Sequence, residues 1–336
     1  MHALFLPALV ALLPVLAFLG ALLYFDSYKL VALKSVMLIV AVGALTAGLA
    51  YAVNGSLVDL ADLDPALFPR YVGPVTEECL KGLVVVILIR TRRIGFLVDA
   101  AIFGFAVGTG FAVVENVYYL GHAENAIMGT WIVRGFGTAL MHGGATAIFA
   151  VAGLALVQRA GRVGVSIFLP GLVVAIALHA VFNNLLLWPK SATLAMLVVL
   201  PLLLNLVFER SNKALGEWLG PGFDADAEML ELIHSGRLSD SPIGQYLHSL
   251  KGKFVGPVLA DLLCYLQLYT ELSLRAKGML MMRENGFVVP VDDETRAKFD
   301  EMRYLEGSIG KTGILAIQPM MRMSFKELWQ LYVLDR

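Results

Sequence analysis

Ionisable and amide side chains interrupt several of the most apolar stretches of this sequence. They comprise three carboxylates, a lysine, two histidines and an asparagine: Glu77, Glu78, Lys81, Glu115, His142, His179 and Asn183. An ionisable side chain inside a membrane-spanning helix is costly and is therefore a candidate for function. Carboxylates and histidines are also the groups that activate water for hydrolysis or relay protons during transport. These residues therefore indicate either a hydrolytic site or a transport pathway.

The spacing within each stretch indicates which side chains share a helix face. Residues four apart do so, and His179 should therefore point the same way as Asn183, and Glu77 the same way as Lys81. The next glutamate follows about 100° around the helix. One carboxylate can then face a cavity while the other is held by a basic residue such as Arg134. A structural ion pair would account for one carboxylate but would not need two.

The composition places these stretches in a membrane. Of 336 residues, 58% are hydrophobic and 16% are charged, whereas a soluble domain is about half apolar and about a quarter charged. The net charge of −1 gives no indication of a nucleic-acid partner. Seven apolar runs are long enough to cross a lipid bilayer as helices. They cover about residues 3–25, 29–53, 72–90, 96–120, 128–157, 165–187 and 191–208.

Lysine and arginine gather at one set of helix ends. These residues are Lys29, Lys34, Arg90, Arg92, Arg93, Arg159, Arg162, Arg210 and Lys213. Because positively charged loops stay in the cytoplasm, the N-terminus should lie outside and the C-terminus inside. From Glu209 onward the charge density returns to that of a soluble protein. We therefore expect an all-α, polytopic membrane helix bundle at 1–208 and a soluble helical domain at 209–336 that faces the cytoplasm and any partner there.

This orientation also predicts how deep the polar side chains lie. Counting from the outer helix ends at 1.5 Å per residue, we expect all five of the carboxylates and histidines about 8–20 Å below the outer surface. The five are Glu77, Glu78, Glu115, His142 and His179. They come from four helices of alternating direction, and chance would scatter them. The sequence therefore predicts a single site in the outer half of the membrane.

Two kinds of chemistry fit such a site. For hydrolysis, a carboxylate can take a proton from water, and His142, His179 and Glu115 could hold zinc with a position open for that water. The amide of Asn183 can donate to a developing oxyanion. The alternative is a non-hydrolytic protein, either a proton-coupled transporter or a scaffold. A transporter should show inverted repeats, and the sequence shows no repeat.

Four short motifs, in this order, resemble those of the PrsW family of bacterial intramembrane proteases, which are related to the CAAX prenyl endopeptidases. They are EECLK from Glu77, FAVVEN from Phe111, the segment from Arg134 to His142, and HAVFN from His179. The resemblance covers about residues 70–187. It implies a multi-pass protease of the bacterial inner membrane that cuts a membrane-anchored protein, such as an anti-sigma factor, near the outer face.

The resemblance also implies roles for single residues. By position, Glu77 looks like the carboxylate that activates water, and Glu78 like its neighbour held by a basic residue. His179 and Asn183 match the motif for oxyanion or metal binding. The prenyl endopeptidases have a histidine in place of Glu115, and their arginine falls one residue after the position of the lysine in EECLK. His142 would replace the missing histidine. Whether the site holds zinc or works as a metal-free glutamate protease stays open.

Overall fold

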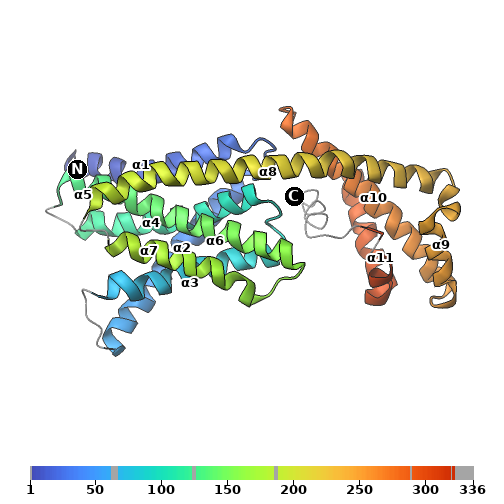
Figure 1. The fold of residues 1–336 in the computed structure, drawn as a ribbon, viewed down its shortest axis with the longest axis horizontal. Helices are drawn as coiled ribbons and strands as arrows, with labels where there is room; N and C mark the ends of the chain where they lie inside the picture. The colour runs from blue at the N-terminus through green and yellow to red at the C-terminus, as the bar shows by residue number, and fades with distance from the viewer. Residues whose placement is uncertain are drawn as a thin grey trace. The chain divides into compact units, whose positions relative to one another are not determined.

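The computed structural model describes residues 2–61, 67–122, 126–184, 188–287, 290–318 and 320–321. The described residues form helices joined by turns, without a strand among them (Figure 1). The first eight helices are α1 (His2–Phe25), α2 (Leu33–Ala61), α3 (Gly73–Arg90), α4 (Leu97–His122), α5 (Met128–Val133), α6 (Ala139–Ala160), α7 (Leu169–Asn184) and α8 (Pro189–His234). Three more follow: α9 (Pro242–Ser249), α10 (Gly256–Glu284) and α11 (Asp293–Ile317).

The chain divides into two compact units, Met1–Asn212 and Lys213–Arg336, and the division falls within α8. Among the described residues, six helical segments are long and apolar enough to cross a membrane. They are Phe5–Phe25, Leu33–Leu60, Leu97–His122, Met128–Ala160, Val165–Asn184 and the apolar part of Pro189–His234. Together with the more polar α3, they correspond to the seven expected runs. The predicted fold class, an all-helical multi-pass bundle, is confirmed.

Helix α4 forms the centre of the first unit, and its side chains are buried almost without interruption from Val98 to Ala112. It packs most extensively against α6 and α2. Two glycines of α4 allow the backbone of α6 to pack close to it. A Cβ on Gly104 would lie 2.7 Å from the carbonyl oxygen of Thr146, and one on Gly108 would lie 2.2 Å from that of His142. The GxxxG spacing in α4 therefore brings the backbone that carries His142 against the helix that carries Glu115.

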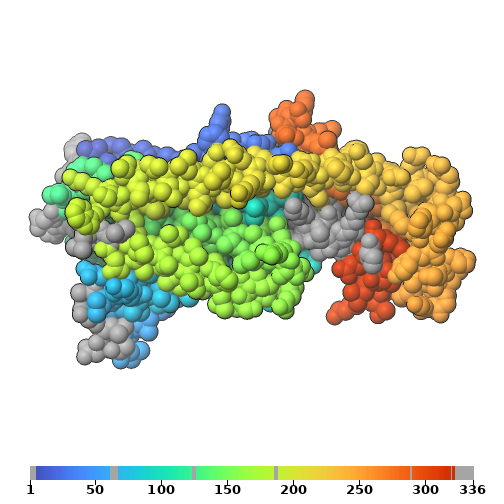
Figure 2. Space-filling model, viewed as in Figure 1, coloured from blue at the N-terminus to red at the C-terminus, as the bar shows by residue number. Residues whose placement is uncertain are grey.

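Helices α1 and α8 lie side by side on the face of the first unit that Figure 2 shows, where α1 is blue and the start of α8 is yellow. A groove runs between them, lined by apolar side chains such as Phe18, Leu22, Leu204 and Phe208. Many side chains of this unit are apolar and exposed, among them Leu202. Such a surface is expected where helices face lipid instead of water.

The second unit has a core of its own. Leu262, Leu266 and Leu272 of α10 pack with Met302 and Leu305 of α11. At the start of α11, the side chain of Asp292 accepts a hydrogen bond from the backbone N–H of Thr295 at 2.9 Å and caps the helix. The unit is a helical bundle with charged side chains on its surface, such as the ion-paired Lys298 and Glu294.

Candidate active site

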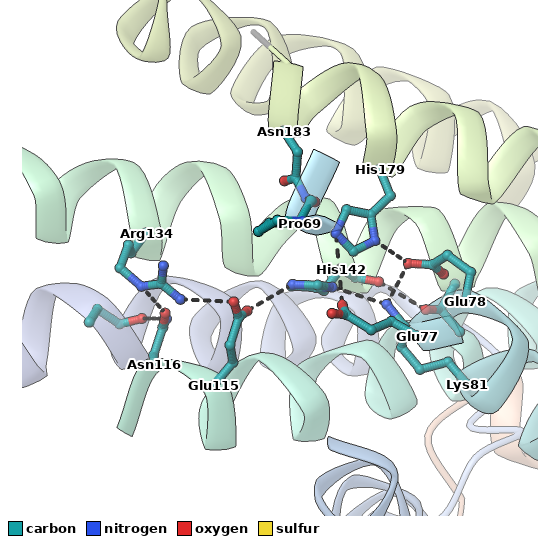
Figure 3. Close-up of polar contacts among 12 residues, drawn as sticks. Pro69, Glu77, Glu78, Lys81, Glu115, Asn116, Arg134, His142, His179 and Asn183 are labelled. Carbon is teal, nitrogen blue, oxygen red and sulfur yellow. Dashed lines mark hydrogen bonds and ion pairs between the residues drawn. The ribbon is translucent and has the colours of Figure 1, made fainter. Parts of the chain in front are cut away.

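Five of the six predicted site residues form one continuous polar network (Figure 3). Glu77 and Glu78 come from α3, Glu115 from α4, His142 from α6 and His179 from α7. The two histidine rings meet edge to face with their centroids 4.7 Å apart. Four helices therefore bring their ionisable groups to one place in the interior of the first unit.

A buried lysine joins two of these helices. The Nζ atom of Lys81 donates to Glu78 Oε1 at 2.5 Å and lies 3.0 Å from His142 Nδ1. The lysine side chain is fully buried and its ammonium faces the ring of Phe111 at 4.6 Å. The spacing in the sequence places Lys81 on the same face of α3 as Glu77. Residues three apart are also neighbours on a helix, and the lysine pairs with Glu78 instead.

The third carboxylate, Glu115, is held from two sides. Its Oε2 atom lies 2.9 Å from His142 Nε2, and its Oε1 atom lies 3.1 Å from an Nη atom of Arg134. Arg134 also donates through Nε to Asn116 Oδ1 at 2.9 Å, and its guanidinium lies 3.6 Å from the ring centroid of Tyr119. The arginine suggested as the basic partner in the α3 pair therefore holds the carboxylate of α4 instead.

Glu77 is held differently from the other two carboxylates. Its Oε2 atom lies 3.8 Å from His179 Nε2, and its Oε1 atom accepts a hydrogen bond from Asn54 Nδ2 at 3.4 Å. No lysine or arginine of the described residues is ion-paired with Glu77. Its side chain is 19% exposed, whereas that of Glu78 is 1% exposed. Glu77 is thus a carboxylate without a cationic partner that keeps some access from outside the protein.

Three of these groups could hold a metal ion. Glu77, His142 and His179 each offer one ligand atom, and the three atoms lie within 4.8 Å of one another. Ligands about 2 Å from a tetrahedral zinc ion lie roughly 3.3 Å apart, so a small closure would suffice. His179 Nδ1 lies 2.8 Å from Glu78 Oε1, which leaves Nε2 directed at Glu77. Carboxylates commonly orient metal-binding histidines in this way.

The ligand set differs from the expected one in its carboxylate. Glu77 converges with the two histidines, while Glu115 hydrogen-bonds to His142 and is an outer partner of that ring. Both ring nitrogens of His142 have partners, Lys81 on Nδ1 and Glu115 on Nε2. A bound ion would have to replace one of them. The two imidazoles and one carboxylate fit a divalent ion that prefers nitrogen and oxygen ligands, such as zinc.

Asn183 lies outside the network. It is one helical turn beyond His179 on α7, and its Nδ2 atom donates to the carbonyl oxygen of Pro69 at 2.8 Å (Figure 3). Sequence reasoning also missed two neighbours of the site. These are Asn54, which directly follows the span expected at 29–53, and Thr76, which the sequence did not mark as a site residue. Only the unusual presence of an amide in an apolar helix could have pointed to Asn54.

The fold and the network together define a class: a multi-pass membrane protein with a buried centre of carboxylates and histidines. A model of the family described as PrsW family intramembrane metalloprotease matches residues 32–207. That is 176 of 336 residues, more than half of the chain, and the chain belongs to this family. A search of curated proteins and a search of solved structures returned no match. Membership of this family assigns the protein to the class of membrane peptidases.

Proposed function

We propose that this protein hydrolyses a peptide bond of a membrane-anchored protein at the centre formed by Glu77, His142 and His179. The observation that supports the proposal most directly is the convergence of these three groups from three helices. The family supplies the reaction class. Two ion pairs adjoin the centre, Glu78 with Lys81 and Glu115 with Arg134, and each of these glutamates contacts one of its two histidines.

In this proposal the three convergent groups hold a zinc ion, which would polarise the scissile carbonyl and activate a bound water. A single oxygen of Glu77 suffices as a ligand, and the other oxygen can accept the proton of the attacking water. Glu78 fixes the ring of His179 through Nδ1, and Glu115 fixes the ring of His142 through Nε2. These contacts hold both imidazoles in one orientation before a substrate arrives.

Asn183 is assigned to the substrate in this proposal. Its amide donates to the carbonyl oxygen of Pro69, which precedes α3, and the side chain is partly exposed. A peptide carbonyl entering beside His179 could replace that of Pro69 as the acceptor. The donor would then face the oxygen on which negative charge develops during hydrolysis.

The proposed substrate is a membrane-anchored protein cut near the outer face of a bacterial inner membrane, such as an anti-sigma factor. The distribution of lysine and arginine supports this orientation, with the N-terminus outside and the C-terminus in the cytoplasm. The C-terminal helical domain, residues 209–336, would then meet cytoplasmic partners. In this orientation the carboxylates and histidines are expected in the outer half of the membrane, which fits cleavage on the outer side.

The test compares protein N-termini in membranes from cells that produce the wild type, Glu77→Ala, or Glu217→Ala as a matched control. Glu217 belongs to the second unit, and its carboxylate is 69% exposed. New N-termini from membrane-anchored proteins should appear with the wild type and the control and be absent with Glu77→Ala, at equal protein levels. The same set of N-termini in all three samples would refute the proposal and favour a transporter or scaffold.

A further inference from the structure

An amide on α2 faces the proposed centre from outside the four helices that build it. Asn54 belongs to α2, and its Nδ2 atom donates to Oε1 of Glu77 at 3.4 Å. The hydroxyl of Thr76 lies 2.5 Å from Oδ1 of the same asparagine and 2.9 Å from the carbonyl oxygen of Gly73. Asn54 is therefore held on one side by Thr76 and contacts Glu77 on the other.

An ionised Glu77 only accepts hydrogen bonds and therefore determines which end of the Asn54 amide faces it, and the hydroxyl of Thr76, which can donate or accept, completes that arrangement. A carboxamide has a donor end and an acceptor end. When Thr76 donates to Oδ1 of Asn54, the NH₂ group is left to face Glu77. The reversed amide would place its oxygen against the carboxylate oxygen, which is repulsive. The three side chains therefore favour one arrangement, in which the amide donates to Glu77.

The kind of partner matters for what Glu77 can do. Glu78 and Glu115 are each paired with a cationic side chain, which already balances the charge of the carboxylate. A neutral amide instead fixes the direction of Glu77 and leaves its negative charge available to a bound cation. A polar side chain in a membrane helix is costly without a hydrogen-bonding partner. Contact with Glu77 and Thr76 gives Asn54 such partners.

We propose that Asn54 and Thr76 are positioning residues that orient Glu77 and thereby set the affinity of the centre for its divalent ion. The inference rests on the proposed function, because it takes Glu77 as a ligand. Outer partners of metal ligands typically contribute about 10–100-fold to metal affinity or activity.

The experiment measures the affinity of the detergent-purified full chain for Zn²⁺ by competition with a chromophoric chelator. Asn54→Ala should weaken binding by about 10–100-fold. Thr76→Val should weaken it in the same direction, and Thr76→Ser, which keeps the hydroxyl, should restore it. Ser56→Ala is the matched control, because Ser56 lies on the same helix and donates to the backbone oxygen of Ala52.

Thermal unfolding of each variant separates positioning from folding. A purely structural role would lower the unfolding midpoint of metal-free Asn54→Ala and leave its Zn²⁺ affinity equal to that of Ser56→Ala, and this result would overturn the inference. A wild type that binds no Zn²⁺ would overturn it too, while cleavage could still be measured. A chain that needs Asn54 for Zn²⁺ binding but cleaves no protein would support the inference and refute the proposed function.

Discussion

Replacing Lys81 with methionine should destabilise the first unit by leaving a buried carboxylate without its cation. The lysine side chain is fully buried, and its ammonium donates to Glu78 at 2.5 Å and lies 3.0 Å from His142 Nδ1. Methionine is unbranched and about as long, so it fills the same space without a large cavity. The change therefore removes the positive charge and leaves the packing against Phe111 largely in place.

The size of the effect follows from the burial of the pair. Removing one partner of a buried ion pair costs about 3–5 kcal/mol, because the other charge stays buried and uncompensated. The unit spans Met1–Asn212, and in proteins of that size 1 kcal/mol shifts the unfolding midpoint by about 2–4 °C. Lys81→Met should therefore lower the midpoint by roughly 6–20 °C. The double variant Lys81→Met/Glu78→Gln removes both charges and should recover most of the loss.

The assay is thermal unfolding of the full chain in detergent, followed for both single variants and the double variant. Lys213→Met is the control, because the side chain of Lys213 is 80% exposed and its ion pair with Glu217 is long, at 3.9 Å. It should change stability by no more than about 0.5 kcal/mol. A double variant as unstable as the sum of the two singles would show that the charges do not interact and would refute the reasoning.

Two further predictions concern the metal and the packing of α4 against α6. Elemental analysis of the purified wild type should find close to one zinc ion per chain, and the variants His142→Ala and His179→Ala should lose it. A wild type that contains no metal and still cleaves protein would contradict this prediction and leave Glu77 as a metal-free catalytic centre. Gly108→Ala should lower the free energy of unfolding by about 1–3 kcal/mol, because the added Cβ would lie 2.2 Å from the carbonyl oxygen of His142. The Cβ added in the control variant Gly48→Ala would meet nothing within 4 Å, and this variant should not be destabilised. Equal unfolding midpoints for these two glycine variants would contradict the close approach of α4 and α6.

The sequence predicted which ionisable residues would meet because a charged side chain is unusual in an apolar helix and can be recognised without knowing its neighbours in space. Glu115 and His142 stand out in their own stretches, and helix direction and rise then give a common depth. The structure brings them into contact at 2.9 Å. Asn183 shares a face with His179 as expected, but its amide reaches Pro69 instead of the network, which face-sharing alone does not determine.

Partners within the network could not be predicted because they depend on how each helix is rotated about its axis. Lys81 is near both glutamates of α3 in sequence, and only packing decides that it pairs with Glu78. Asn54 was missed because an amide at the expected end of a span looks like a loop residue, whereas α2 continues to Ala61. The contact with Glu77 then requires knowing how α2 packs against α3.

The charges of the network point to Glu77 as the place where a cation would bind. Two of its three carboxylates are matched by cations, Glu78 by Lys81 and Glu115 by Arg134. When ionised, the third carboxylate, Glu77, carries a charge that no lysine or arginine of the described residues balances by an ion pair, and a neutral amide holds it. A divalent ion beside Glu77 and two imidazoles would compensate that charge and gain from each ligand. At this centre an ion would have to replace Lys81 or Glu115 at one nitrogen of His142, whereas at either of the other carboxylates it would have to compete with the lysine or arginine that is paired with that carboxylate.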